Sequence, residues 1–390
     1  MERSRCGTYI LMSSPRLIKF TFFRVMAGAP SSFQRKSGPA PGVRGLGALP
    51  GVNPSLHSNQ LLTSTGTPHL DTLLGGGLPL GSLLILQEDS GGSYGKLLVR
   101  YFLSEGLVHN QALLAVQGGG REMLSALPSI EEKGEEGRKG KEDDEEKMKI
   151  AWRYQGQTNT KGESATGAIR GHVFNLLKTV SKEVVENADT SSINLEDIDS
   201  SEKGWKGSKY CALLNSIKAR LSQGFMLEGK EVPPSKVLRI GVSSLGEIGW
   251  GKREDVSDHL STFLLGLRAL LRSSLSVAVI SLPSHLHTSN LISERLALCS
   301  DFVVELESFD ETEAKVNTAY KDYHGLVRVL KLPSLGTLCP PPHLSTLSGE
   351  LVFKSRRTQF VIEKFCLPPD LGEKVSRDTK ASATKVDIDF

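Results

Sequence analysis

The sequence contains few cysteines, and none of them has a closely spaced partner. Its five cysteines show no C-x-x-C or C-x-x-H spacing, whereas cysteine zinc modules need closely spaced ligands and disulfide scaffolds are short and rich in cysteine. The sequence therefore argues against metal and disulfide chemistry and predicts free thiols in a reducing compartment. The cysteines are Cys6, Cys211, Cys299, Cys339 and Cys366, of which Cys211 and Cys299 are expected in core helices.

Long apolar runs and an excess of charge of one sign are also absent. No stretch approaches the roughly 18 to 20 consecutive apolar residues that a membrane-spanning helix requires. The chain is 38% hydrophobic and 23% charged with a net charge of +3, which permits a buried core and does not indicate a nucleic-acid or acidic partner. We expect a soluble protein without membrane contact.

The N-terminal region has little hydrophobic periodicity. Residues 1–25 carry one acid and five bases, as organelle transit peptides do, but Met26 opens a plausible start of its own, so we favour an alternative N-terminal extension. Residues 26–59 are rich in Gly, Pro and Ser and are predicted to form a disordered arm. A single domain is expected over residues 60–370, with polar insertions at about 128–147 and 156–207, followed by a tail over 371–390.

Apolar runs alternate with amphipathic stretches along the predicted domain. A strand that ends near residue 87, a helix over 96–105 and a second strand at 112–117 form a parallel crossover unit. Helices are predicted over 68–74, 210–223, 259–275 and 291–299, and further strands over 237–246, 276–283, 301–309, 325–333 and 359–365. The order predicts an α/β fold with a mostly parallel central sheet that ends in antiparallel strands.

The segment "DSGGSYGKLL" has the position and the glycine content of a phosphate-binding loop. Gly91, Gly92 and Gly95 give a permissive backbone, and Lys96 stands at the start of the following helix, whose N-terminus attracts anions. The pattern G-x-x-x-x-G-K-[ST] is incomplete, however, because Ser90 and Leu97 occupy its outer positions.

A leucine supplies no hydroxyl for Mg²⁺, and the later buried strands end without the carboxylate that positions metal and water in such enzymes. Glu88 and Asp89 precede the loop and are expected to serve only with an unusual geometry. We favour a connecting loop that no longer hydrolyses nucleotide, and residual nucleotide binding remains the alternative.

Several separate segments resemble one known family. They are "SSFQRK", "MKIAWRYQ", "LRIGVSSLGEIGWG", "LRALLRSSLSVAVISLPSHL", "DFVVELESF", "YKDYHGLVRVLKLP" and the ending "DIDF". In this order, from about Ser31 to Phe390, they resemble the PAXNEB family, the subunit-four family of the Elongator complex. The stretch "TGTPHLDTLLGGGLPLGSLLIL" is similar to the opening of RecA-type ATPase domains.

The resemblance implies a RecA-like fold without intact ATPase motifs. It implies a hetero-hexameric ring with Elongator subunits five and six that binds tRNA and, with the Elongator catalytic core, supports modification of wobble uridines at carbon 5, in the cytoplasm and the nucleus. A link to transcription elongation belongs to the same resemblance. No cofactor is implied, although ATP at the level of the ring stays open. The alternatives are an active P-loop ATPase acting on nucleic acid and a nucleotide-sensing structural ring subunit.

Basic residues are the candidates for contact with RNA or with neighbouring ring subunits, because phosphates require positive charge. A solvated surface is the competing interpretation for each of them. The loop "EIGWGKRED" also offers Trp250, either exposed at an interface or packed beneath its own loop, and His285 and His287 are expected to belong to a loop. The basic candidates are Lys252, Arg253, Arg268, Arg272, Lys354, Arg356 and Arg357.

Overall fold

The fold was obtained as a computed structural model. It describes residues 49–55, 60–89, 91–118, 123–130, 171–198, 204–227, 234–251, 253–283, 286, 290–309, 320–333 and 349–365. All of these lie in one unit of the chain, Gly45–Phe390. No helix in these ranges has the length and apolar character needed to cross a membrane.

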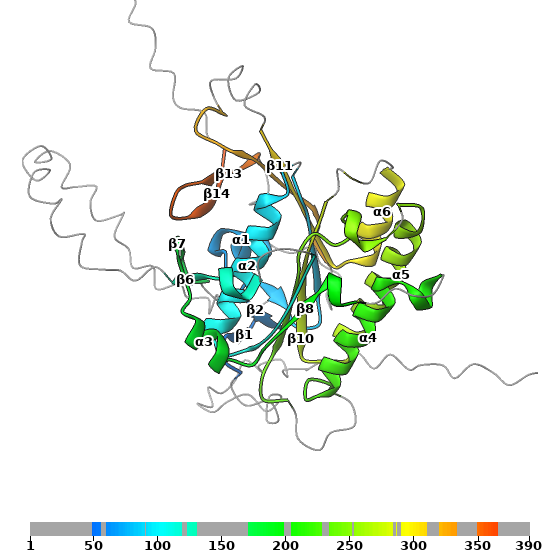
Figure 1. Ribbon diagram of the computed structural model, residues 1–390. Coiled ribbons are helices and arrows are strands. Elements are labelled where there is room, and N and C mark those ends of the chain that lie inside the picture. Colours follow the sequence, from blue (N-terminus) through cyan, green and yellow to red (C-terminus); the bar gives the residue numbers. More distant parts are fainter. Residues whose placement is uncertain are drawn as a thin grey trace, which may run out of the picture. The chain divides into compact units, whose positions relative to one another are not determined.

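A nine-stranded sheet forms the centre of the described structure (Figure 1). Its order is β14-β13-β12-β11-β4-β10-β9-β5-β8. The six strands from β11 to β8 pair in parallel, and β12, β13 and β14 continue the sheet in antiparallel fashion. The strands are β4 (Leu83–Gln87), β5 (Ala112–Gln117), β8 (Thr190–Asn194), β9 (Leu238–Val242), β10 (Ser276–Leu282), β11 (Phe302–Ser308), β12 (Gly325–Lys331), β13 (Leu351–Ser355) and β14 (Phe360–Lys364).

Helices cover both faces of this sheet, which explains why its inner parallel strands are mostly apolar on both faces. Alternate residues of β4 enter two different cores, with Leu84 and Leu86 on the side of α2 and Leu83 and Ile85 on the side of α5. Figure 1 shows α1, α2 and α3 on one side and α4, α5 and α6 on the other. The helices are α1 (Pro68–Leu73), α2 (Ser93–Val108), α3 (Lys182–Asn187), α4 (Lys209–Ser222), α5 (Arg253–Arg272) and α6 (Asn290–Cys299).

Two small sheets flank α2. One contains β1 (Val52–Pro54), β2 (Leu61–Thr63) and β3 (Leu78–Pro79), and the other pairs β6 (Pro128–Ile130) with β7 (Phe174–Thr179). In the second sheet Ile130 lies opposite Phe174, so the chain returns after residue 173 to the point where it left after residue 130. Short 3-10 helices occur at Met123–Ala126, Leu195–Asp197, Trp205–Gly207 and Ile248–Trp250.

The structure confirms the predicted α/β class, the mostly parallel sheet and its antiparallel end. The helix predicted over 96–105 extends from Ser93 to Val108. Strand β1 lies within the arm expected over 26–59, β6 lies within the polar insertion expected at about 128–147, and β7, α3 and β8 lie within the polar insertion expected over 156–207. Strand β13 was not predicted, and residues 1–25 and 371–390 lie outside the described ranges.

Arg239 is a charged residue at the centre of the parallel sheet, on strand β9, and it is fully buried. Its guanidinium donates to Gln111 Oε1 at 2.5 Å, to the Phe102 carbonyl at 2.9 Å and to Thr63 Oγ1 at 2.7 Å. It also donates to the Ser64 carbonyl at 2.8 Å and lies 4.7 Å from the centre of the Phe102 ring. One side chain therefore connects β9 to α2, to β2 and to the start of β5.

Burial lowers the pKa of Arg239 to about 10, and the nearby carboxylates of Glu105 and Asp71 oppose that shift. The guanidinium is therefore charged at neutral pH. A buried ion without its partners destabilises the folded state. The five groups around Arg239 therefore stabilise its charge, and Arg239 in turn supplies the hydrogen bonds that these buried groups need.

Replacing Arg239 should destabilise the whole domain. We expect Arg239→Met to lower the free energy of unfolding by roughly 3–5 kcal/mol, because it leaves buried acceptors and a buried carboxylate without their cation. Urea unfolding followed by far-UV circular dichroism measures this change. Arg328→Met, on the half-exposed side chain of β12, is the matched control and should shift stability by less than about 0.5 kcal/mol; equal effects of the two variants would contradict the prediction.

Candidate functional site

The predicted phosphate loop connects the carboxyl end of β4 to the start of α2, as the sequence indicated. Gly92 caps the helix with φ of +62°, a left-handed conformation that favours glycine. Gly91 is exposed, whereas Gly95 is buried in the first turn of α2 and Lys96 follows it, half-buried. The structure thus brings the four predicted nucleotide-binding residues into one loop and one helix start.

The centre of this loop is filled by the chain's own carboxylate, Glu88. A Cβ atom on Gly95 would lie 2.5 Å from Glu88 Cγ, and one on Gly92 would lie 3.3 Å from Glu88 Oε2. Glycine at position 95 is therefore required by the Glu88 side chain that packs against it. The carboxylate stands at the N-terminus of α2, where an anion is favoured by the exposed N–H groups and the helix dipole.

Glu88 accepts hydrogen bonds from serines near the carboxyl ends of β9 and β10. Ser244, just after β9, donates its hydroxyl to the Glu88 carboxylate at 3.0 and 3.2 Å. Burial raises the pKa of Glu88, while hydrogen bonds from Ser281 and Ser244 and the charge of Lys96 oppose that rise. A carboxylate thus does stand at the carboxyl end of the sheet, but it comes from β4 itself.

Asp89 occupies a second part of the loop. Its Oδ2 accepts the Gly91 N–H at 3.1 Å, a backbone donor of the kind that phosphate loops direct at their ligand. Its other carboxylate oxygen is buried and has no hydrogen-bond partner among the described residues. Two carboxylates, Glu88 and Asp89, therefore stand where a bound phosphate would bring more negative charge.

Leu97 and Trp250 have structural roles. Leu97, at the position of the metal-binding hydroxyl, packs against the core on the α2 side of the sheet. Trp250 is buried, its ring stacks on Tyr210 at 5.2 Å between centroids, and its indole N–H donates to the Ser244 carbonyl at 3.1 Å. Of the two interpretations of Trp250, packing beneath its own loop is correct. Ser90, His285 and His287 lie outside the described residues.

The basic candidates whose side chains the structure describes do not come together in one site. Arg268 and Arg272 on α5 both pair with the buried carboxylate of Asp301, at 2.9 and 2.6 Å, and this use explains their spacing. Asp301 in turn accepts the backbone N–H of Leu83 at the start of β4. Through Asp301, the two arginines therefore connect α5 to β4 of the sheet.

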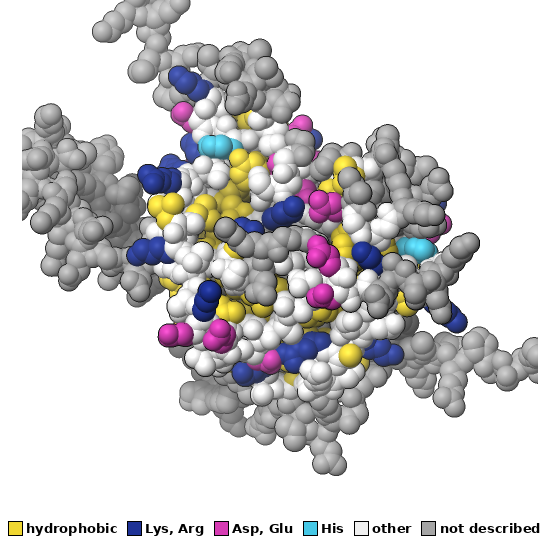
Figure 2. All heavy atoms as spheres, viewed as in Figure 1, with side chains coloured by type: hydrophobic (Ala, Val, Ile, Leu, Met, Phe, Trp, Pro, Cys, Tyr) yellow, Lys and Arg dark blue, Asp and Glu magenta, His cyan; other side chains and the backbone are white. Residues whose placement is uncertain are grey.

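The remaining candidates lie elsewhere. Lys354 on β13 pairs with Glu363 at 2.6 Å and lies over the Tyr323 ring at 4.2 Å, while Arg356 and Arg357 are exposed in the turn that follows. Helix α5 begins at Arg253, and the side chains of Lys252 and Arg253 lie outside the described set. Figure 1 shows β13 and α5 well apart, and on the face drawn in Figure 2 basic and acidic side chains are interspersed.

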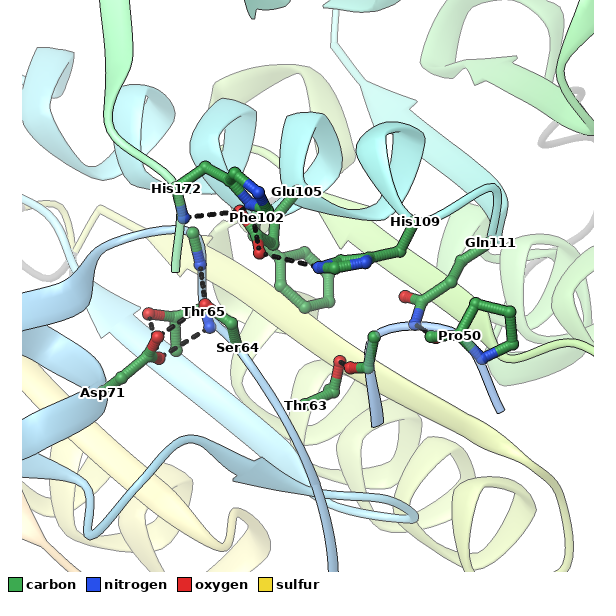
Figure 3. A network of polar contacts seen from close by, with 12 residues as sticks. Pro50, Thr63, Ser64, Thr65, Asp71, Phe102, Glu105, His109, Gln111 and His172 are labelled. Carbon is green, nitrogen blue, oxygen red and sulfur yellow. Dashed lines mark hydrogen bonds and ion pairs between the residues drawn. The ribbon is translucent and has the colours of Figure 1, made fainter. Parts of the chain in front are cut away.

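A second cluster of ionisable groups was missed by the sequence analysis. Glu105 on α2 accepts hydrogen bonds from His109 and His172 (Figure 3), and it interacts electrostatically with Arg239 and Asp71. Burial would raise the pKa of Glu105, but the His109 hydrogen bond, the Arg239 charge and the His172 N–H together lower it. The one signal in the sequence was an arginine inside the apolar run "VLRIGV".

Asp71 is the most perturbed carboxylate of this cluster. It accepts hydrogen bonds from Ser64 Oγ at 2.5 Å and from the Thr65 N–H and hydroxyl, each at 2.7 Å. Burial nevertheless raises its pKa to about 6. Its ionisation therefore falls within the pH range in which folded proteins are commonly studied.

The stability of the protein should report the titration of Asp71. The folded-state pKa of about 6 exceeds the ordinary value of 3.8, so the folded state binds the proton more tightly, and this contribution to stability is lost as pH rises through about 6. Between pH 7 and pH 4 we expect the free energy of unfolding of the wild type to rise relative to that of Asp71→Asn, by up to roughly 3 kcal/mol. Urea unfolding at each pH, with the exposed Asp197→Asn as control, measures it; a constant difference would refute the assignment.

Comparison of the sequence with known proteins places this chain in a family. The PAXNEB family profile, described as "PAXNEB protein", matches residues 46–390. A Xenopus laevis protein named "Elongator complex protein 4" is 39% identical over 377 residues, covering 90% of each chain. Proteins of the same name from Danio rerio and Homo sapiens are 38% and 36% identical, covering 91% and 90% of this chain and 92% and 88% of theirs. The chain belongs to the PAXNEB family.

Proposed function

We propose that this chain is a non-catalytic accessory subunit of the Elongator complex. The observation that carries the proposal is the match to proteins named "Elongator complex protein 4" at 36–39% identity over about 90% of the chain. In this proposal the chain assembles with Elongator subunits five and six into a hetero-hexameric ring. The ring binds tRNA and supports the catalytic core in modifying wobble uridines at carbon 5, in the cytoplasm and the nucleus.

The topology supports a RecA-like assignment within this proposal. The loop over 88–92 leaves the carboxyl end of β4, which lies between β10 and β11 in the parallel part of the sheet. Nucleotide loops of open α/β sheets occupy this position, where the strand order changes direction. A ring subunit with this ancestry keeps the fold and its loop while the chemistry resides elsewhere.

The local chemistry of the loop supports a non-catalytic role. Glu88 and Asp89 occupy the anion-binding position with their own negative charges, and the Asp89 carboxylate already accepts the Gly91 N–H. Leu97 packs in the core and offers no hydroxyl for Mg²⁺. These features disfavour the alternative of an independent P-loop ATPase, and a nucleotide held between subunits of the ring remains a separate hypothesis.

Assembly tests the proposed function directly. We expect the purified chain alone to self-associate poorly, and the chain co-expressed with Elongator subunits five and six to give a complex with two copies of each, measured by light scattering after size exclusion. The same complex should retard tRNA on native gels, with retardation that weakens as salt rises because phosphate contacts release counterions. A stable hexamer of this chain alone, or no co-purification, would overturn the assignment.

The loop should bind nucleotide only when its own carboxylate is neutralised. Glu88→Gln removes a negative charge beside the anion position, and we expect it to raise ATP affinity at least about tenfold, a change of roughly 1.4 kcal/mol. Adding Lys96→Ala to that variant should abolish the gain. Isothermal titration of the assembled ring measures both, with Glu186→Gln on the exposed surface of α3 as control. Tight ATP binding by the wild type that Lys96→Ala abolishes would show an active loop.

A further inference from the structure

Three potential metal ligands converge beside the C-terminal half of α2, away from the phosphate loop (Figure 3). Glu105 Oε1 lies 3.1 Å from His109 Nε2 and 3.1 Å from His172 Nδ1. One donor atom from each of the three residues lies within 4.8 Å of the others. Two ligands bound to zinc at about 2.1 Å in tetrahedral geometry are separated by about 3.4 Å, so the two carboxylate–imidazole distances are close to those of a metal site.

Separate parts of the chain create this arrangement. Glu105 and His109 are one helical turn apart on α2 and therefore project from the same face. His172 comes from the segment just before β7, 67 residues further along the chain than Glu105, and its backbone N–H donates to Glu105 Oε2 at 3.1 Å. That backbone bond fixes the main chain of His172 against the carboxylate independently of its ring.

The burial of the three side chains is graded. Glu105 has no exposed side-chain surface, whereas 25% of His109 and 37% of His172 is exposed. The two imidazoles thus form the outer side of the cluster, which an ion reaches from solvent and where water completes its coordination. The two imidazole rings lie next to each other, with 5.4 Å between their centroids.

The charges around the cluster favour an added cation. Arg239 contributes one positive charge, and Glu105 and Asp71 contribute two negative charges when both are ionised. His109 Nε2 and His172 Nδ1 both face Glu105 Oε1. Because a carboxylate oxygen only accepts hydrogen bonds, each of these two nitrogens must carry a proton when no ion is present. A bound metal takes the place of these two N–H groups, and each neutral ring keeps its proton on the other nitrogen, which leaves the imidazoles uncharged.

We propose that Glu105, His109 and His172 bind a zinc ion that fastens α2 to the segment preceding β7. Two imidazole nitrogens and one carboxylate oxygen suit zinc better than Mg²⁺ or Ca²⁺, which select oxygen-rich sites, and better than ions that need thiolates. The cysteine spacing gave no indication of such a site, because no cysteine takes part. The ion joins the C-terminal end of α2 to the residues that precede β7 and has a structural role.

Cobalt substitution tests the site in the full chain purified without a histidine tag. Co²⁺ titrated into the metal-free protein should give one equivalent of visible d–d absorption, which Zn²⁺ then displaces, and Zn²⁺ should raise the Tm of the wild type. His109→Gln and His172→Gln should each lose the absorption and weaken Zn²⁺ binding by more than the ~10–100-fold that loss of an outer partner costs. Neither variant should gain Tm from Zn²⁺.

His259→Gln is the matched control, because this histidine lies on α5, against Trp205, and has no part in the cluster. It should keep the one-equivalent absorption and the rise in Tm. Circular dichroism of the two partly exposed histidine variants confirms that they fold, so the test does not depend on replacing buried Glu105. No saturable absorption in the wild type, or equal absorption in the wild type and both cluster variants, would overturn the proposal.

Discussion

The structure depends on a buried cation in the middle of its sheet. Arg239 lies at a fully buried position of β9, and its five hydrogen-bond and ring contacts come from β2 and the residue after it, from α2 and from the residue before β5. A buried guanidinium is stable only when its donors are satisfied and its charge is balanced. That requirement determines where Gln111, Glu105 and Asp71 lie, and through them the position of α2 on the sheet.

The phosphate loop and the cluster around Arg239 share one physical principle. In each, a group that usually meets an external partner is satisfied from within the chain: the N-terminus of α2 by Glu88, and the Glu105 carboxylate by Arg239 and two histidines. At the N-terminus of α2 the internal carboxylate is present at fixed geometry and loses no translational freedom, so it competes effectively with a free anion.

The sequence predicted the parts of the fold that local patterns determine. Apolar runs such as "SVAVISLP" revealed the inner strands, because both of their faces are buried. Strands β8 and β13 were missed since each lies in a polar context and owes its structure to a neighbouring strand. The glycines of the loop and Lys96 were recognised, but the position of Glu88 and the meeting of Glu105 with His172 result from tertiary contacts that no spacing in the sequence encodes.

The pairing of Ile130 with Phe174 has a consequence for how this chain tolerates change in length. Residues 131–173 connect the two members of one antiparallel pair, and neither member belongs to the central sheet. Closing a flexible loop costs only about 0.6 kcal/mol more for each doubling of its length. Insertions and deletions over 131–170, before the segment that carries His172, can therefore accumulate while the order of strands on either side stays the same.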